Sequence, residues 1–138
     1  PYQWQVEQSV KSLVKKLSIK KLNFILSYQS RVGPLKWIGP STEKVIKEEA
    51  KKNKIIVVVP VAFVSEHSET LVELDIEYRK LAEENGSKDY VRVPAVTVNQ
   101  DFINSLKSSI LQASKGERLT SSIKCLEKFK KCPRIQNL

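Results

Sequence analysis

Three glutamates recur at four-residue spacing in a segment that also holds the only histidine of the 138-residue chain, His67. On a helix, residues four apart lie on one face, so Glu69, Glu73 and Glu77 form a line of carboxylates. Like charges at this spacing repel one another, and a sequence shaped by stability alone would place lysine among them. The line is either a solvated acidic face near a helix N-terminus or a set of hard oxygen ligands for a divalent cation, with His67 at its mouth.

Other catalytic signatures do not occur in the sequence. The His-Glu-x-x-His spacing of zinc proteases is absent, as are a Ser-His-Asp pattern and a glycine-rich phosphate loop. A lone histidine more often has a structural role. The place of His67 between Glu66 and Glu69, at a predicted strand-to-helix turn, strengthens the functional interpretation.

A second unusual segment, residues 29–40, contains two Gly-Pro pairs, which exclude regular structure. It nevertheless carries the bulky apolar side chains of Leu35, Trp37 and Ile38, which solvated loops rarely do. Together with Phe63, these side chains either cap a sheet or border a wide apolar ligand.

Helices and strands must position both segments. Apolar periodicity predicts helices over residues 6–17, from Ser41 or Thr42 to about 53, over about 66–84 and over about 101–113. Short apolar runs predict strands at residues 22–28, 55–59 and 90–93. This alternation predicts an α/β fold, a Rossmann-like parallel sheet layered with helices. Both unusual segments follow predicted strands, and such sheets bind ligands at the carboxyl ends of their strands.

Charge and composition narrow the classes of partner. The formal net charge is +9, but the lysines are scattered, and no recognition motif or aromatic platform accompanies them. We therefore expect a solvated surface rather than a nucleic-acid interface, with a basic patch against acidic lipid as an alternative. No apolar run approaches the roughly 20 residues that cross a bilayer, so the expected location is cytoplasmic, with a peripheral contact at the inner membrane still open.

The two cysteines, Cys125 and Cys132, lie close together near the C-terminus. They are expected to be free thiols in a reducing cytoplasm, although one disulfide or half of a four-thiolate site is also compatible with them. Two thiols cannot complete an iron-sulfur site alone, so we expect no cluster.

Several segments, in one collinear order, resemble the signatures of ferrochelatases. They are Gln29-Ser-Arg-Val-Gly-Pro-Leu-Lys-Trp-Ile-Gly-Pro-Ser-Thr, the strand that ends at Pro60, and Phe63-Val-Ser-Glu-His-Ser-Glu-Thr-Leu-Val-Glu-Leu-Asp-Ile-Glu-Tyr. The opening Pro1-Tyr-Gln-Trp-Gln-Val and the later Arg92-Val-Pro-Ala are similar to further blocks of that family. The resemblance extends from Pro1 to about residue 111.

The resemblance implies one half of a two-domain chelatase fold and the insertion of Fe2+ into protoporphyrin IX, the last step of heme synthesis. By position, Glu69 would be the active-site carboxylate and His67 its partner. The metal would be handled by Glu69, Glu73 and Glu77. The residues that would border the porphyrin are Trp37, Phe63, Val32, Pro34 and Leu35. Iron is then a substrate, and no further cofactor is required.

The same resemblance places the family's principal histidine just before Pro1. With no methionine in the sequence, we expect residues 1–114 to be an incomplete C-terminal ferrochelatase-like domain that lacks the N-terminal half of the same chain. Residues 115–138 are expected to be a tail. The chain alone is then expected to be inactive. The alternative is a noncatalytic tetrapyrrole- or metal-binding module from a truncated paralogue.

Overall fold

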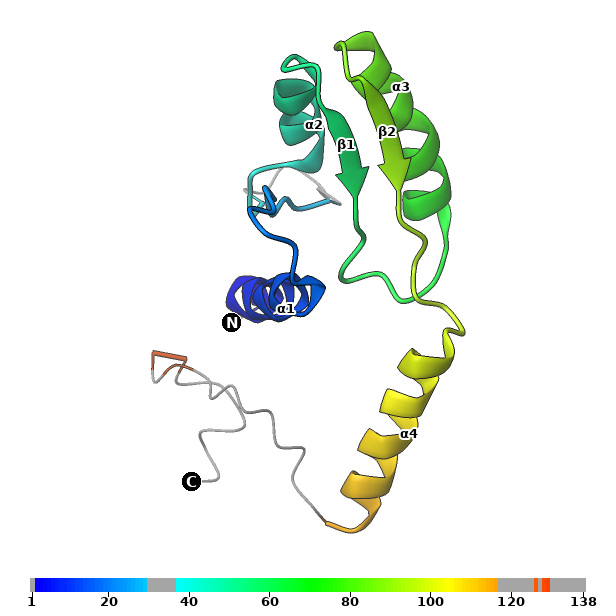
Figure 1. Ribbon diagram of the computed structural model, residues 1–138. Helices are drawn as coiled ribbons and strands as arrows, with labels where there is room; N and C mark the ends of the chain where they lie inside the picture. Colours follow the sequence, from blue (N-terminus) through cyan, green and yellow to red (C-terminus); the bar gives the residue numbers. More distant parts are fainter. Residues whose placement is uncertain (1, 30–36, 117–125, 127, 130–138) are drawn as a thin grey trace. The chain divides into compact units, whose positions relative to one another are not determined.

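The computed structural model describes residues 2–29, 37–116, 126, 128 and 129 (Figure 1). The elements are α1 (Tyr2–Leu17), α2 (Thr42–Ala50), β1 (Ile55–Val58), η1 (Glu69–Glu77), α3 (Tyr78–Glu84), β2 (Asp89–Arg92) and α4 (Gln100–Ser114). Gln3–Thr97 form one compact unit, and α4 belongs to a second. None of the helices in the described ranges is long and apolar enough to cross a membrane.

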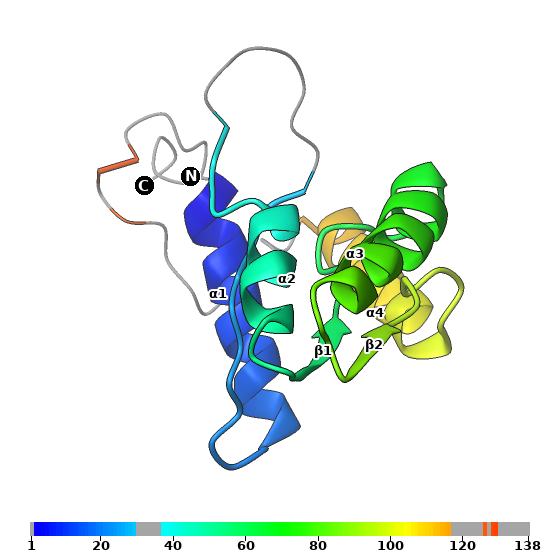
Figure 2. The same cartoon turned by 90° about the horizontal axis from the view of Figure 1, so that it is seen from above.

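The centre of the first unit is a parallel pair of strands. In the register of β1 and β2, Ile55 lies opposite Asp89 and Val58 opposite Arg92. Helices α2 and α3 lie on the same face of this pair (Figure 2). The chain passes from β1 through η1 and α3 to β2. This β-helix-β unit confirms the predicted α/β class with a parallel sheet.

The core lies between the sheet and the two helices. Ile46 of α2, Ala82 of α3 and Tyr90 of β2 are almost fully buried, and Ile56 and Val58 of β1 pack against them. The opposite face of the sheet is open, although a continuous apolar run such as residues 55–59 is typical of a strand covered by helices on both sides. Ile55 and Val57 are 55% and 57% exposed there, because α2 and α3 both cover the other face.

Helix termini follow the sequence signals closely. Ser41 is the N-cap of α2, and its side chain accepts a hydrogen bond from the Lys44 N–H at 3.4 Å. The α3 helix stops before Gly86, whose φ of +87° is the left-handed conformation that glycine adopts without strain. The predicted last helix is confirmed as α4 within one residue at each end.

The predicted strand at residues 22–28 does not form. Within the described ranges only Tyr28 of this segment makes a bridge, a parallel one with Ser41. Tyr28 N–H donates to the Pro40 carbonyl at 2.9 Å, and Thr42 N–H donates to the Tyr28 carbonyl at 3.3 Å. A strand needs a hydrogen-bonded neighbour along its length, and this segment has one at a single residue.

The predicted helix over residues 66–84 starts later and is wound differently. Residues 69–77 form a π-helix, η1, whose N–H groups bond carbonyls five residues earlier, as Tyr78 does to Glu73. The wider turn places Thr70 and Leu74 inward, with relative exposures of 0% and 3%. Leu71, which α-helical spacing would place inward together with Leu74 and Tyr78, is 47% exposed on this winding.

Candidate active site

His67 lies in the turn between β1 and η1, where hydrogen bonds fix both its backbone and its ring. The buried hydroxyl of Thr70 accepts from the His67 N–H at 2.9 Å and donates to the His67 carbonyl at 3.0 Å. The Nδ1 atom of His67 accepts from the Glu69 N–H at 3.2 Å. An accepting Nδ1 carries no proton, so the neutral ring holds its proton on Nε2.

The ring of His67 packs against a second predicted site residue. Its centroid lies 4.8 Å from that of Phe63, with an interplanar angle of 66°, in an edge-to-face arrangement. The structure therefore brings together His67, Phe63 and the start of the glutamate line at Glu69, all after the carboxyl end of β1. This is the edge at which parallel sheets bind ligands.

Gln29 connects Trp37 with the π-helix η1. The Trp37 indole N–H donates to the Gln29 carbonyl at 3.1 Å, and the Gln29 side-chain amide donates to the Glu73 carboxylate. Gln29 thus links Trp37 to Glu73 through two hydrogen bonds. Val32, Pro34 and Leu35 lie outside the described residues.

The glutamate line flanks the buried face of η1. Each of the three glutamates directly precedes a residue that packs inward. Glu69 and Glu73 are half-buried, whereas Glu77 is exposed. Burial raises the pKa of the neighbouring Tyr78 hydroxyl; the hydrogen bond with Gln29 opposes this, and the charges of Glu73, Glu43 and Glu77 raise it further. The charges of Glu73, Glu43 and Glu77 thus all act on the Tyr78 hydroxyl, and Glu43 is in addition paired with Lys47 at 2.6 Å.

The carboxylates do not converge on one point. Among the described residues, no group of three or more His, Cys, Asp or Glu side chains is arranged to hold a metal ion. The assignment of Glu69, Glu73 and Glu77 as metal ligands thus stays a prediction. Cys125 and Cys132 fall outside the described residues.

Glu66 anchors the turn that carries His67. One of its oxygens, Oε1, accepts from Arg92 Nη1 at 2.7 Å and from the Ala95 N–H at 2.9 Å. The Thr70 hydroxyl, the Arg92 guanidinium and the Ala95 N–H, in that order, lower the pKa of Glu66 to about 2. This carboxylate ties the segment after β1 to the segment after β2.

The low pKa of Glu66 predicts acid sensitivity of the fold. A carboxyl group whose pKa falls from 4.5 to about 2 on folding stabilises the folded state above pH 4.5, and this stabilisation is lost as the pH falls toward 2. We expect urea midpoints of the wild-type chain to fall across this window and those of Glu66→Gln to fall less. At neutral pH, Glu66→Gln should be the less stable of the two, because the charge of Arg92 loses a partner.

Glu48→Gln is the matched control for this titration. Glu48 lies on the exposed surface of α2, 3.7 Å from Lys44, and its substitution should leave the pH dependence of the midpoint as in the wild type. Equal slopes for Glu66→Gln and wild type would contradict the role given to Glu66.

Sequence reasoning missed two polar residues of this region. Gln29 and Arg92 both lie within segments that resemble the family, but neither was given a role. The available signal was position, since Gln29 follows one predicted strand and Arg92 lies near the end of another. Their contacts with Glu73 and Glu66 span 44 and 26 residues of sequence, which no local pattern predicts.

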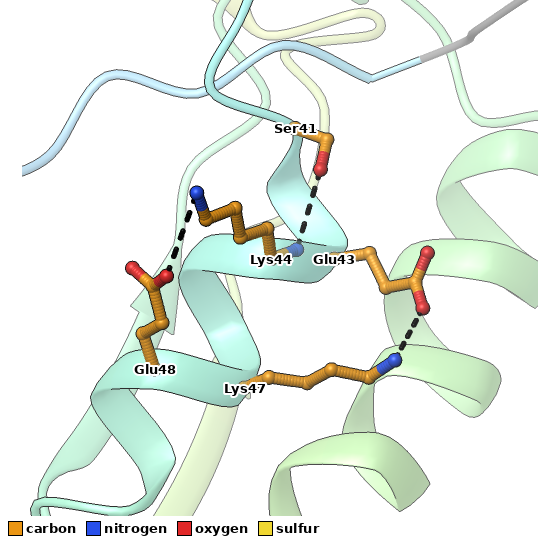
Figure 3. A pocket seen from close by; sticks show the side chains of 5 residues that line it. All are labelled: Ser41, Glu43, Lys44, Lys47 and Glu48. Atoms are coloured by element: carbon orange, nitrogen blue, oxygen red, sulfur yellow. Dashed lines mark hydrogen bonds and ion pairs between the residues drawn. The ribbon is translucent and has the colours of Figure 1, made fainter.

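A hollow of about 360 Å³ on the surface of α2 is a separate feature (Figure 3). Its charged lining residues pair with one another: Lys47 with Glu43 at 2.6 Å and Lys44 with Glu48 at 3.7 Å. Ser41, which also lines it, is occupied as the cap of α2. None of the predicted site residues lines this hollow, so we do not assign the site to it.

Fold and site together define an α/β protein in which a histidine and a line of carboxylates follow the end of a parallel strand. The family model described as Ferrochelatase matches residues 1–114. A ferrochelatase of Pelagibacter ubique (strain HTCC1062) is 60% identical over 137 residues, which cover 96% of this chain and 40% of that protein. A ferrochelatase of Rickettsia bellii (strain OSU 85-389) is 47% identical, covering 96% of this chain and 39% of the relative.

The chain belongs to the ferrochelatase family. A third relative, the ferrochelatase of Rickettsia prowazekii (strain Madrid E), is 44% identical over 138 residues, again with 96% of this chain and 40% of the relative covered. The chain thus spans about 40% of the length of these curated relatives.

Proposed function

We propose that this chain is the C-terminal part of a ferrochelatase, and that the complete protein inserts Fe2+ into protoporphyrin IX to form protoheme. The observation that carries the proposal is the 60% identity to a ferrochelatase over 96% of the chain. The matched length takes in the turn with His67 and the line of glutamates, so the chemistry is argued from those residues.

The reaction gives carboxylates two tasks. One Fe2+ ion enters the macrocycle, must lose its water ligands, and replaces two pyrrole protons, so protoporphyrin and Fe2+ give protoheme and two protons. Glu69, half-buried beside His67, is suited to accept a pyrrole proton. Glu73 and Glu77 continue the line of carboxylates away from it, and their oxygens are ligands that hard divalent cations accept.

Apolar residues would hold the porphyrin. Phe63 packs against His67, and Trp37, 47% exposed, is tied through Gln29 to Glu73. An aromatic surface next to a carboxylate line places a flat ligand and the proton acceptor in one region. We assign Val32, Pro34 and Leu35 to the same wall on the strength of the resemblance alone.

The remainder of a complete ferrochelatase would supply the rest of the site. The open face of the sheet, with Ile55 and Val57 more than half exposed, is consistent with packing against further parts of a longer protein. We therefore propose that the 138-residue chain alone does not catalyse metal insertion.

The test compares the complete protein with this chain. Fe2+ and protoporphyrin IX are mixed anaerobically with each, and protoheme is followed by its absorption spectrum. We expect protoheme with the complete protein and none above the uncatalysed rate with the chain. Porphyrin binding without metal insertion by the complete protein would instead identify a noncatalytic tetrapyrrole-binding module and overturn the proposal.

A further inference from the structure

Arg92 is the most deeply buried residue of a charged network beside the candidate active site. The other members of this network are Glu66, Asp75 and Arg79. Its side chain is 7% exposed, and it lies at the carboxyl end of β2. A buried guanidinium is retained at low cost only if carboxylates and hydrogen bonds compensate its charge. Arg92 has two such carboxylates, from two different segments.

The two arms of the guanidinium hold different parts of the site. Nη1 donates to Glu66 in the His67 turn at 2.7 Å, and Nη2 donates to Asp75 in η1 at 3.0 Å. Glu66 and Asp75 lie on either side of Glu69 in sequence. One rigid, planar group thus sets the separation between the turn and the helix.

The contact between Arg92 and Glu66 positions His67 through the backbone. The Glu66 carboxylate also accepts from the Ala95 N–H, and the Val64 carbonyl accepts from the Thr97 N–H at 3.0 Å. Residues on both sides of Ser65 are therefore fixed to the segment after β2. His67 begins the hydrogen-bonded turn of Thr70 and Glu69 directly after this anchor.

We propose that Arg92 is a positioning residue, which holds the His67 turn at Glu66 and the π-helix at Asp75 and thereby orients His67 and Glu69. Its effect on catalysis rests on the proposed function, whereas its effect on the His67 ring rests on geometry alone. Lysine cannot replace it, because a single ammonium lacks the fork that reaches two carboxylates at once.

Arg79 provides the matched control. Its Nη2 donates to the other oxygen of Asp75 at 3.1 Å, and its Nη1 donates to the Tyr90 carbonyl at 2.7 Å. It belongs to the same charged network, but within the described part of the chain its hydrogen bonds and ring contact are with Asp75 and Tyr90 rather than with Glu66 or the His67 turn. Arg79→Lys thus makes the same chemical change without loosening the turn.

The first readout is the imidazole 15N spectrum of the 138-residue chain, in which His67 gives the only histidine signals. We expect the wild type to show a single tautomer with the proton on Nε2. Arg92→Lys should shift these signals toward tautomer averaging, and Arg79→Lys should leave them unchanged. Glu66→Gln weakens the same contact from the other side by removing the carboxylate charge, and it decides the matter if Arg92→Lys does not fold.

The second readout is iron insertion by the complete protein. Arg92→Lys is expected to lower kcat about 10- to 100-fold, the loss that misplaced catalytic groups produce, with little change in KM for the porphyrin. Arg79→Lys should stay within about twofold of the wild type. Unchanged imidazole signals in both Arg92→Lys and Glu66→Gln, or equal changes in Arg79→Lys, would overturn the proposal. A wild type that inserts no iron would refute the proposed function and leave the spectroscopic result to decide on Arg92.

Discussion

Glu69→Gln in the complete protein is expected to lower kcat for iron insertion about 10²- to 10⁴-fold, the usual contribution of a positioned proton acceptor. Glutamine keeps the size of the side chain but cannot accept a pyrrole proton at neutral pH. The hydrogen bond to His67 Nδ1 comes from the Glu69 backbone N–H, so the substitution leaves the ring of His67 in place. The loss therefore reports the chemistry of the carboxylate.

The rate of protoheme formation at saturating Fe2+ and protoporphyrin IX measures this effect. Glu83→Gln is the matched control, because Glu83 lies exposed on α3 outside the glutamate line, and it should stay near the wild-type rate. Activity of Glu69→Gln within a few-fold of wild type would remove Glu69 from the mechanism. Porphyrin affinity measured by fluorescence should change little in either variant.

The elements with strong local signals were predictable from sequence. Ser41 caps α2, Gly86 ends α3, and the apolar run at residues 55–59 contains β1, because capping and β-branched runs act over a few residues. The grouping of Phe63, His67 and Glu69 was also predictable, since the three residues lie within one stretch of seven residues.

The winding of η1 was not predictable from the same signals. Residues distant in sequence form hydrogen bonds with η1. The Tyr90 hydroxyl donates to the Leu74 carbonyl, and the Arg92 guanidinium donates to the Asp75 carboxylate across 17 residues of sequence. These contacts favour an inward Thr70 and Leu74 over the apolar Leu71. Periodicity in the sequence assumes α-helical turns and so assigns the wrong face at Leu71. π-Helical turns are often found at functional sites, which agrees with the place of η1 in this fold.

The strand expected at residues 22–28 failed for a related reason. Its apolar residues fit a strand, but Phe24 and Ile25 are 48% and 47% exposed, and only Tyr28 is paired. Strand formation depends on a neighbour as much as on the residues themselves. Within the described ranges β1 pairs with β2 and does not act as a neighbour for residues 22–28.

We expect the two nitrogens of His67 to have separate roles, and a pair of substitutions tests this. Nδ1 accepts from the Glu69 N–H at 3.2 Å, which caps the start of η1, whereas Nε2 is the atom that carries the proton in the neutral ring. Asparagine places an acceptor oxygen near the position of Nδ1 and lacks any atom near Nε2. Glutamine extends its amide toward the position of Nε2 and loses the acceptor beside the Glu69 N–H.

We therefore expect His67→Asn to keep the stability of the wild type and to lower kcat for iron insertion about 10²-fold. His67→Gln should instead lose about 1 kcal/mol of unfolding free energy, the net value of one hydrogen bond, and retain more activity than His67→Asn. Urea unfolding and initial rates of protoheme formation give the two quantities on the same preparations. If both variants lost stability and activity in proportion, the ring would act through the fold alone, because a purely structural histidine has no use for Nε2.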